Sequence, residues 1–181
     1  MSKKISVLIG SLRKDSFNKK VAQEIIKLAS GNLVFEILEI GHLEHYNEDI
    51  DGDNPPKSWT DFRNKIKTSD GFLFCTPEYN RSVPSVLKNA IDIGSRPYGQ
   101  NSWGGKPGAI VSVSMSALGA FGANHHLRQS MVFVDVLMMQ QPEAYIGNAH
   151  TLFNEAGELA EGTKKFLQNY INAYENWVNK F

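Results

Sequence analysis

The fold is decided by the segment GFLFCTPEYNRSVPSVLKNAIDI, residues 71–93. Residues 71–75 form a nearly continuous apolar run, which is typical of a strand covered on both faces of a sheet. A polar loop follows, and then Pro84, whose fixed φ and missing N–H suit the first turn of a helix. We expect this helix to extend to about Ile93. The segment therefore predicts a loop that leaves a buried strand and enters a helix.

Similar units lie on both sides of this segment. Four more short apolar runs are predicted as strands, at residues 5–9, 33–40, 108–114 and 143–146. The run at 33–40 alone is broken by Glu36 and Glu39, which indicates an edge strand with one wetter face. Apolar residues at helical spacing predict the other helices, at residues 17–29, 58–68, 123–139 and 166–181.

This alternation predicts the fold class α/β, with a five-stranded parallel, doubly wound sheet and right-handed crossovers. The length of 181 residues fits a single domain, residues 1–181. Ligands of such sheets bind at the carboxyl ends of the strands, near the topological switch point. The loops after the first, third and fourth strands are therefore the candidate site.

The charge and the cysteine content of the chain exclude several classes of binding partner and of structural site. The chain has 19 Lys and Arg against 19 Asp and Glu, so it lacks the positive field that favours nucleic acid or anionic membranes. A single cysteine excludes an internal disulfide framework and a multi-cysteine zinc site. No apolar run approaches the length that spans a bilayer. We expect a cytoplasmic protein that binds neither nucleic acid nor membrane.

The loop after the first strand, residues 10–18, favours an anion. Ser11, Arg13, Ser16 and Asn18 surround a helix N-terminus, where backbone N–H groups and the helix dipole attract phosphate. The alternative is that Ser16 only caps the helix and Arg13 is solvated. Neither the dinucleotide fingerprint G-x-G-x-x-G nor a Walker A motif is present. A mononucleotide such as FMN stays possible.

The other two loops suit a flat ligand, and the second of these also suggests an alternative function, a serine hydrolase. In residues 76–84, Tyr79 and Asn80 offer an aromatic face and an amide, although a rigid turn has the same composition. Small residues at 112–122 let the backbone approach a ligand. Ser114 also precedes Asp135 and His150 in the order of an α/β-hydrolase triad. Serines at 112 and 116 stand where the nucleophile elbow needs glycine, which makes a serine hydrolase the remote alternative.

No metal site is predicted. His42 and His45 lie in a polar loop without a second pair of ligands. Asp49, Asp51 and Asp53 alternate as in a calcium loop, but the required glycine and closing glutamate are missing.

Three segments resemble the NAD(P)H-dependent FMN reductase family of flavodoxin-like proteins, which includes quinone, azo-dye and chromate reductases. They are TPEYNRSVPSVLKNAIDIGSRP (76–97), GSLRKDSFNKKVA (10–22) and GKPGAIVSVSMSALGAFGANHHLRQ (105–129). The resemblance extends from Ile5 to about Gly147. It implies a flavodoxin-like three-layer sandwich with strand order 2-1-3-4-5 and FMN at the switch point.

The resemblance also implies which residues bind the cofactor. The FMN phosphate loop corresponds to Ser11, Arg13, Ser16 and Asn18. The loop beside the isoalloxazine ring and ribityl chain corresponds to Pro77, Glu78, Tyr79 and Asn80. The loop at the other edge of the ring corresponds to Ser114, Met115, Ser116 and Gly119. This third loop departs from the family pattern at Ser112, Met115, Ser116, Ala120, Gly122 and Asn124.

The implied activity is transfer of hydride from NADPH or NADH through bound FMN to a small acceptor, by a ping-pong mechanism. Quinones, azo dyes, nitro compounds, metal oxyanions and free flavin are all compatible acceptors. The flavin supplies the chemistry, so no catalytic side chain is assigned, and the Glu78 side chain is expected to point away from the ring. The alternative is a flavodoxin-like electron carrier, a class that tends to be strongly acidic.

Family members are usually homodimers and sometimes tetramers. Apolar residues wrap more than one face of the helix predicted at 123–139, namely Met131, Phe133, Val134, Val136, Leu137, Met138 and Met139. This excess is compatible with a subunit interface. The alternative is a helix clamped between the sheet and the C-terminal helix.

Overall fold

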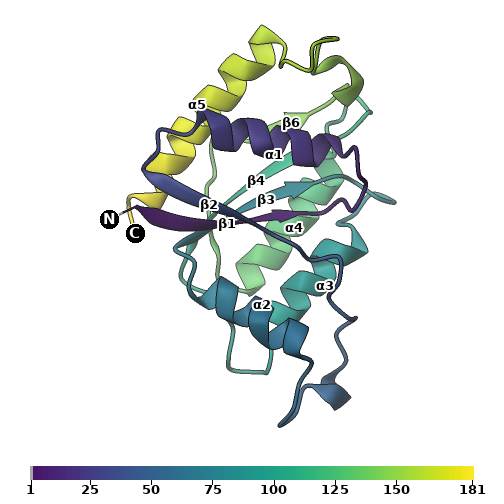
Figure 1. Cartoon of the computed structure of the whole chain (residues 1–181), viewed down its shortest axis with the longest axis vertical. Helices are drawn as coiled ribbons and strands as arrows, with labels where there is room; N and C mark the ends of the chain where they lie inside the picture. Colours follow the sequence, from purple (N-terminus) through teal and green to yellow (C-terminus); the bar gives the residue numbers. More distant parts are fainter. Residues whose placement is uncertain (1) are drawn as a thin grey trace.

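The computed structural model describes residues 2–181 and consists of a central sheet between two layers of helices (Figure 1). The strands are β1 (Lys3–Ile9), β2 (Leu33–Leu38), β3 (Gly71–Thr76), β4 (Pro107–Val113), β5 (Leu137–Met138) and β6 (Ala144–Ile146). The α-helices are α1 (Phe17–Leu28), α2 (Lys57–Lys67), α3 (Ser85–Gly94), α4 (Phe121–Phe133) and α5 (Glu161–Val178). Two short 3₁₀ helices lie at η1 (Glu48–Ile50) and η2 (Ala149–Thr151).

All strand pairs are parallel, and the order β2-β1-β3-β4-β5 confirms the predicted flavodoxin-like sheet. The fifth position is shared by two short pieces, because β5 pairs with the start of β4 and β6 with its end. The strand predicted at 143–146 is confirmed as β6. The edge position of the strand predicted at 33–40 is also confirmed, as β2, where Glu36 pairs with Lys4 and Lys65, each at 2.8 Å.

The alternation of side chains along each strand builds two separate cores. In β3, Leu73 and Cys75 pack on the face covered by α1 and α5, whereas Phe72 and Phe74 pack on the face covered by α2, α3 and α4. Figure 1 shows the two helical layers on opposite sides of the sheet. Burial on both faces explains why the strands read as continuous apolar runs.

The prediction of a helix at 123–139 is wrong for its second half, which is not helical. Helix α4 ends at Phe133, because Asp135 takes a left-handed conformation with φ of 59°. The chain then turns back, and Leu137 and Met138 pair with Pro107 and Gly108 of β4. Val136 and Met139 are therefore buried in the core, so much of the apparent apolar excess has an internal partner.

The architecture places three loops at one edge of the sheet. Strands β1, β3 and β4 are neighbours and parallel, so their carboxyl ends lie side by side. We call the segments that follow them the first loop (residues 10–16), the second loop (77–84) and the third loop (114–120). None of the helices in residues 2–181 combines the length and apolar character that crossing a membrane requires.

Candidate functional site

A cavity of about 310 Å³ opens between the three loops. Ten of the twelve predicted cofactor-binding residues line it: Ser11, Arg13, Ser16, Asn18, Pro77, Glu78, Tyr79, Ser114, Met115 and Ser116. Phe17 and Val113 complete the wall. The two predicted residues that do not line it are Asn80 and Gly119. We call this space the three-loop cavity.

The first loop leaves its backbone donors free. The N–H of Gly10 donates to the Cys75 carbonyl at 2.8 Å and holds the start of the loop against β3. Beyond it, none of the backbone N–H groups of residues 11–16 donates a hydrogen bond within residues 2–181. Ser16 caps α1, because its hydroxyl accepts from the Lys19 N–H at 3.3 Å. Free N–H groups at a capped helix start are what a phosphate requires.

A buried polar atom at the floor of the cavity supports the same conclusion. Asn18 is 4% exposed, and its Nδ2 donates to the Val113 carbonyl at 3.3 Å. Its Oδ1 has no hydrogen-bond partner among the described residues. An unpaired buried acceptor costs free energy unless a ligand or water donates to it. A ligand with hydroxyl groups, such as the ribityl chain of FMN, would satisfy it, so the residues present fit FMN.

The second loop is a tight turn. The N–H groups of Tyr79 and Ser82 each donate to the other residue's carbonyl, at 3.1 and 3.0 Å. Asn80 and Arg81 form the tip with φ of 50° and 64°, a left-handed pair that asparagine tolerates better than most residues. This position explains why Asn80 lies outside the cavity wall, while Tyr79 is exposed at its rim.

The carboxylate of Glu78 is bound to helix α4. Its Oε2 accepts from the Ala123 N–H at 3.0 Å, and its Oε1 accepts from Arg81 Nη1 at 3.2 Å. A carboxylate at a helix N-terminus is stabilised by the helix dipole. The side chain therefore connects the second loop to α4, and the part of Glu78 left for a ligand is its backbone.

The third loop is held by its own hydrogen bonds and by β6. The Ser114 N–H donates to the Ile146 carbonyl, and the Ala149 N–H donates to the Ser114 carbonyl, both at 3.0 Å. Gly119 turns the chain with φ of 58° and lies against β6, where an added Cβ would be 2.5 Å from the carbonyl carbon of Tyr145. Gly119 thus shapes the loop from behind the cavity wall.

Two of the departures from the family pattern bind each other. Ser112 and Asn124 are fully buried, and Asn124 Nδ2 donates to Ser112 Oγ at 3.1 Å. The Ser112 hydroxyl donates to the Gly119 carbonyl at 2.7 Å, and Arg128 Nε donates to Asn124 Oδ1 at 3.1 Å. Sequence reasoning missed this pair. The sequence does carry a signal of this pair: one polar residue stands at a core position of a buried strand, and a second stands at a core position of the helix that follows.

The structure does not assemble the serine hydrolase triad. The Ser114 hydroxyl donates to the Ser116 carbonyl at 3.1 Å. Ser114 follows the end of β4, whereas the Asp135 carbonyl accepts from the Gly105 N–H, just before the start of β4. The full length of the strand therefore separates the serine from the aspartate.

Cys75 lies at the same edge of the sheet but is buried. Burial raises the pKa of its thiol to about 12, which keeps it protonated near neutral pH. Within residues 2–181, no group of three or more His, Cys, Asp and Glu side chains is placed to hold a metal ion.

The comparisons with known proteins agree with this geometry. The family described as NADPH-dependent FMN reductase matches residues 3–151. A quinone reductase of Pseudomonas putida KT2440 is 55% identical over 174 residues, which cover 96% of this chain and 94% of that protein. A 2-hydroxy-1,4-benzoquinone reductase of a Burkholderia species is 45% identical over 179 residues, covering 98% and 97%. The solved flavoenzyme NAD(P)H:(acceptor) oxidoreductase of Paracoccus denitrificans superposes with a TM-score of 0.92 at 45% identity, covering 98% of both chains.

Proposed function

This chain belongs to the NADPH-dependent FMN reductase family, and on that premise we propose that the three-loop cavity binds FMN and that the enzyme reduces quinones with NADPH or NADH. The observation that carries the proposal is the cavity itself. It is lined by ten residues predicted from the sequence, and its floor contains the unpaired Oδ1 of Asn18. Relatives at 55% and 45% identity are named as quinone reductases.

Each loop has a distinct part in holding the cofactor. The free N–H groups of the first loop, together with the Ser11 hydroxyl and the Arg13 guanidinium, would bind the phosphate. The second and third loops also line the cavity and would enclose the ring. When bound, FMN supplies the transfer of two electrons from nicotinamide to the acceptor.

The rim of the cavity suits flat substrates. Tyr79 of the second loop and Met115 of the third loop line the cavity and are exposed. Such an open apolar rim can stack a nicotinamide ring and, after it leaves, a quinone. We therefore propose alternate use of one opening, which is ping-pong kinetics. The chain needs no acid or base side chain for this exchange.

Anaerobic spectroscopy tests the proposal. We expect the purified protein, incubated with FMN and freed of excess, to keep a flavin spectrum that bleaches with NADPH or NADH and returns with a quinone. Initial rates at several fixed quinone concentrations should give parallel double-reciprocal lines. Absence of bound flavin would contradict the site. Bound flavin that neither nucleotide bleaches would instead favour the electron carrier.

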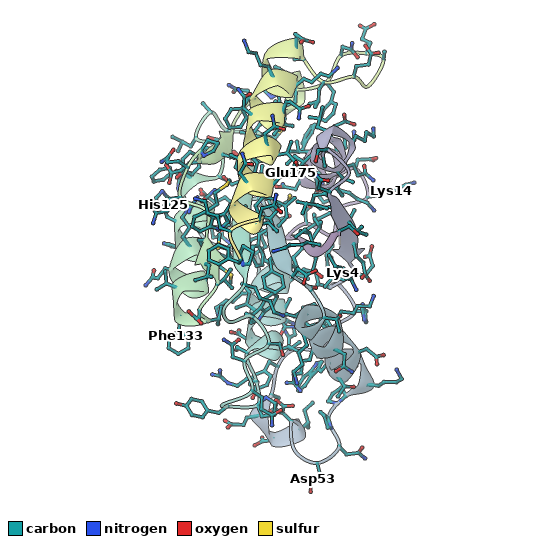
Figure 2. All side chains as sticks on the ribbon, turned by 90° about the vertical axis from the view of Figure 1, so that its left-hand side faces the viewer. Lys4, Lys14, Asp53, His125, Phe133 and Glu175 are labelled. Atoms are coloured by element: carbon teal, nitrogen blue, oxygen red, sulfur yellow. The ribbon has the colours of Figure 1, made fainter. Side chains whose placement is uncertain are left out.

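We also propose that the protein is a homodimer through the end of α4. Val132 and Phe133 are 75% and 82% exposed, and Figure 2 shows Phe133 projecting from the surface. Beside them a cavity of about 360 Å³ lies between α3 and α4. Sedimentation velocity should show a dimer or a tetramer, and Phe133→Lys should shift it toward the monomer. A wild-type monomer at micromolar concentration would contradict this assignment.

A cytoplasmic location is part of the same proposal, because the enzyme consumes NAD(P)H and keeps Cys75 as a free thiol. Fractionation of expressing cells should recover the activity with cytoplasmic markers. Recovery with extracytoplasmic markers would contradict it.

A further inference from the structure

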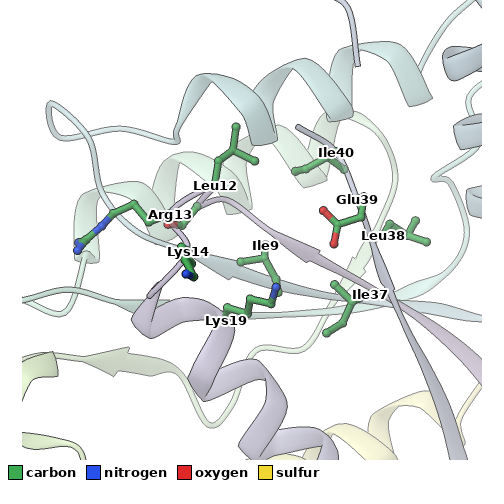
Figure 3. A pocket seen from close by; sticks show the side chains of 10 residues that line it. Ile9, Leu12, Arg13, Lys14, Lys19, Ile37, Leu38, Glu39 and Ile40 are labelled. Atoms are coloured by element: carbon green, nitrogen blue, oxygen red, sulfur yellow. The ribbon is translucent and has the colours of Figure 1, made fainter. Parts of the chain in front are cut away.

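A second cavity, of about 130 Å³, lies on the opposite side of the first loop from the three-loop cavity (Figure 3). It is bounded by the first loop, the start of α1 and the chain at the end of β2. The two cavities share only Ser11 and Arg13. The first loop is therefore a wall between two spaces, and the resemblance to FMN reductases assigns a ligand to only one of them.

The lining of the second cavity combines an apolar floor with a charged rim. The floor is formed by the buried Ile9, Leu38 and Ile40 with the half-buried Ile37, and the exposed Leu12 lies at the edge. The rim is formed by Arg13, Lys14, Lys19 and Glu39. Figure 3 shows Lys14 and Lys19 on the α1 side of the cavity and Glu39 on the opposite side, where the chain leaves β2. Two positive charges, on Lys14 and Lys19, thus lie across the cavity from one negative charge, whereas the Arg13 guanidinium points away from Glu39.

The three cationic side chains have no protein partner. Arg13, Lys14 and Lys19 form no ion pair within residues 2–181, and their side chains donate no hydrogen bond there. The nearby Lys4 and Lys65 differ, because each is 2.8 Å from a Glu36 oxygen. Several unpaired cations around a small cavity create a positive potential that attracts an anionic group.

We propose that the second cavity binds the adenosine 2′-phosphate of NADPH, with the phosphate on Lys14 and Lys19. This inference rests on the proposed function, which brings the nicotinamide end to the three-loop cavity. A dinucleotide that passes Arg13 would enter both spaces, because Arg13 lines both. The apolar floor fits the adenine ring, whereas a simple inorganic anion would leave that floor unused. NADH lacks this phosphate, so the site would favour NADPH.

Nucleotide preference in steady state gives the first test. In the FMN-loaded enzyme, Lys14→Gln combined with Lys19→Gln should raise the ratio of KM for NADPH to KM for NADH about tenfold, since two charge-assisted contacts to a phosphate are lost. The matched control is Lys20→Gln, which removes the same charge one residue away. Lys20 lies over the rings of Phe17 and Phe153, at 5.8 and 5.9 Å, and does not line the cavity. An unchanged ratio in the double variant, or an equal change in the control, would overturn the proposal.

A binding measurement tests the second cavity independently of the enzyme's activity. Calorimetry on the FMN-loaded protein would compare 2′,5′-ADP, 5′-AMP and inorganic phosphate. We expect 2′,5′-ADP to bind about tenfold more tightly than 5′-AMP, with an advantage that shrinks in the double variant and at high salt. Equal affinity for 2′,5′-ADP and 5′-AMP, or for 2′,5′-ADP and inorganic phosphate, would overturn the proposal. If neither nicotinamide nucleotide were oxidised, the proposed function would fail while these titrations still decided the site.

Discussion

The first and third loops line the same cavity but are held in opposite ways. The first loop has no internal backbone hydrogen bonds between residues 11 and 16, and its own Arg13 and Lys14 form no ion pair within residues 2–181. The third loop bonds to itself and to β6, and the buried Ser112 and Asn124 hold it from behind. A loop that binds an anion must keep its donors free, whereas a loop that meets a ring must already have its final shape.

The comparison predicts that changes in the third loop act on stability, and changes in the first loop on ligand affinity. The largest effect is expected for Gly119→Ala, because a left-handed φ and a Cβ 2.5 Å from the backbone of Tyr145 act together. We expect a loss of about 3 kcal/mol in the free energy of unfolding, measured by urea titration of the FMN-free protein.

The control for this change is Gly157→Ala. Gly157 has φ of 78°, but nothing lies within 4 Å of an added Cβ. Its substitution should cost only the conformational strain, about 1 kcal/mol. Equal losses at the two positions would show that contact with β6 does not hold the third loop.

The next effect tests the buried pair behind the loop. Asn124→Leu removes the donor to Ser112 Oγ and the acceptor of Arg128 Nε, while the Ser112 bond to Gly119 and the Arg128 bond to Met139 stay, and should cost about 2 kcal/mol of stability. In a double-mutant cycle with Ser112→Ala, we expect a coupling of about 1 kcal/mol. Additive losses would mean that the two departures from the family pattern are independent.

A substitution in the first loop should change the affinity for FMN and leave the stability nearly unchanged. Arg13 is exposed and unpaired, so Arg13→Gln should change the stability of the FMN-free protein by less than about 0.5 kcal/mol. It should raise the Kd for FMN about tenfold, because a bidentate contact to the phosphate is lost. Quenching of flavin fluorescence on titration measures this. An unchanged Kd would remove Arg13 from the phosphate site.

The smallest effect concerns pH. Burial, together with the neighbouring Glu143, raises the pKa of Tyr145 to about 12 from its ordinary value of 10.0. As the pH rises, the unfolded chain loses the Tyr145 proton before the folded chain does. The contribution of this hydroxyl to the free energy of unfolding is therefore complete below pH 10 and is lost between pH 10 and 12. Tyr145→Phe should make the decline of stability over that range shallower than in wild type. Tyr98→Phe, which changes an exposed phenol, is the control, and equal slopes in both variants would contradict the assignment.

The strands could be predicted from sequence because they are buried on both faces. Each predicted strand at 5–9, 71–75 and 108–114 matches an observed strand to within two residues at either end. The helix at 123–139 failed because helical spacing does not detect a tertiary partner. Leu137 and Met138 continue the apolar pattern of α4, yet they pair with β4.

The candidate site was predictable to the extent that it follows strand ends. Loops that leave adjacent parallel strands must meet, so the lining residues of the first and second loops could be placed from the sequence. The bond between Ser112 and Asn124 could not, because it depends on how α4 lies against β4. The second cavity also escaped prediction, since Lys14 and Glu39 come together only through the pairing of β1 with β2.

The contact between Glu78 and the start of α4 has a thermodynamic consequence. The helix begins at a wall of the three-loop cavity and ends at Phe133, on the proposed dimer face. Any coupling carried by this helix is reciprocal: FMN that tightens subunit association must itself bind more tightly to the associated form. The dissociation constant for FMN would then depend on the protein concentration at which it is measured.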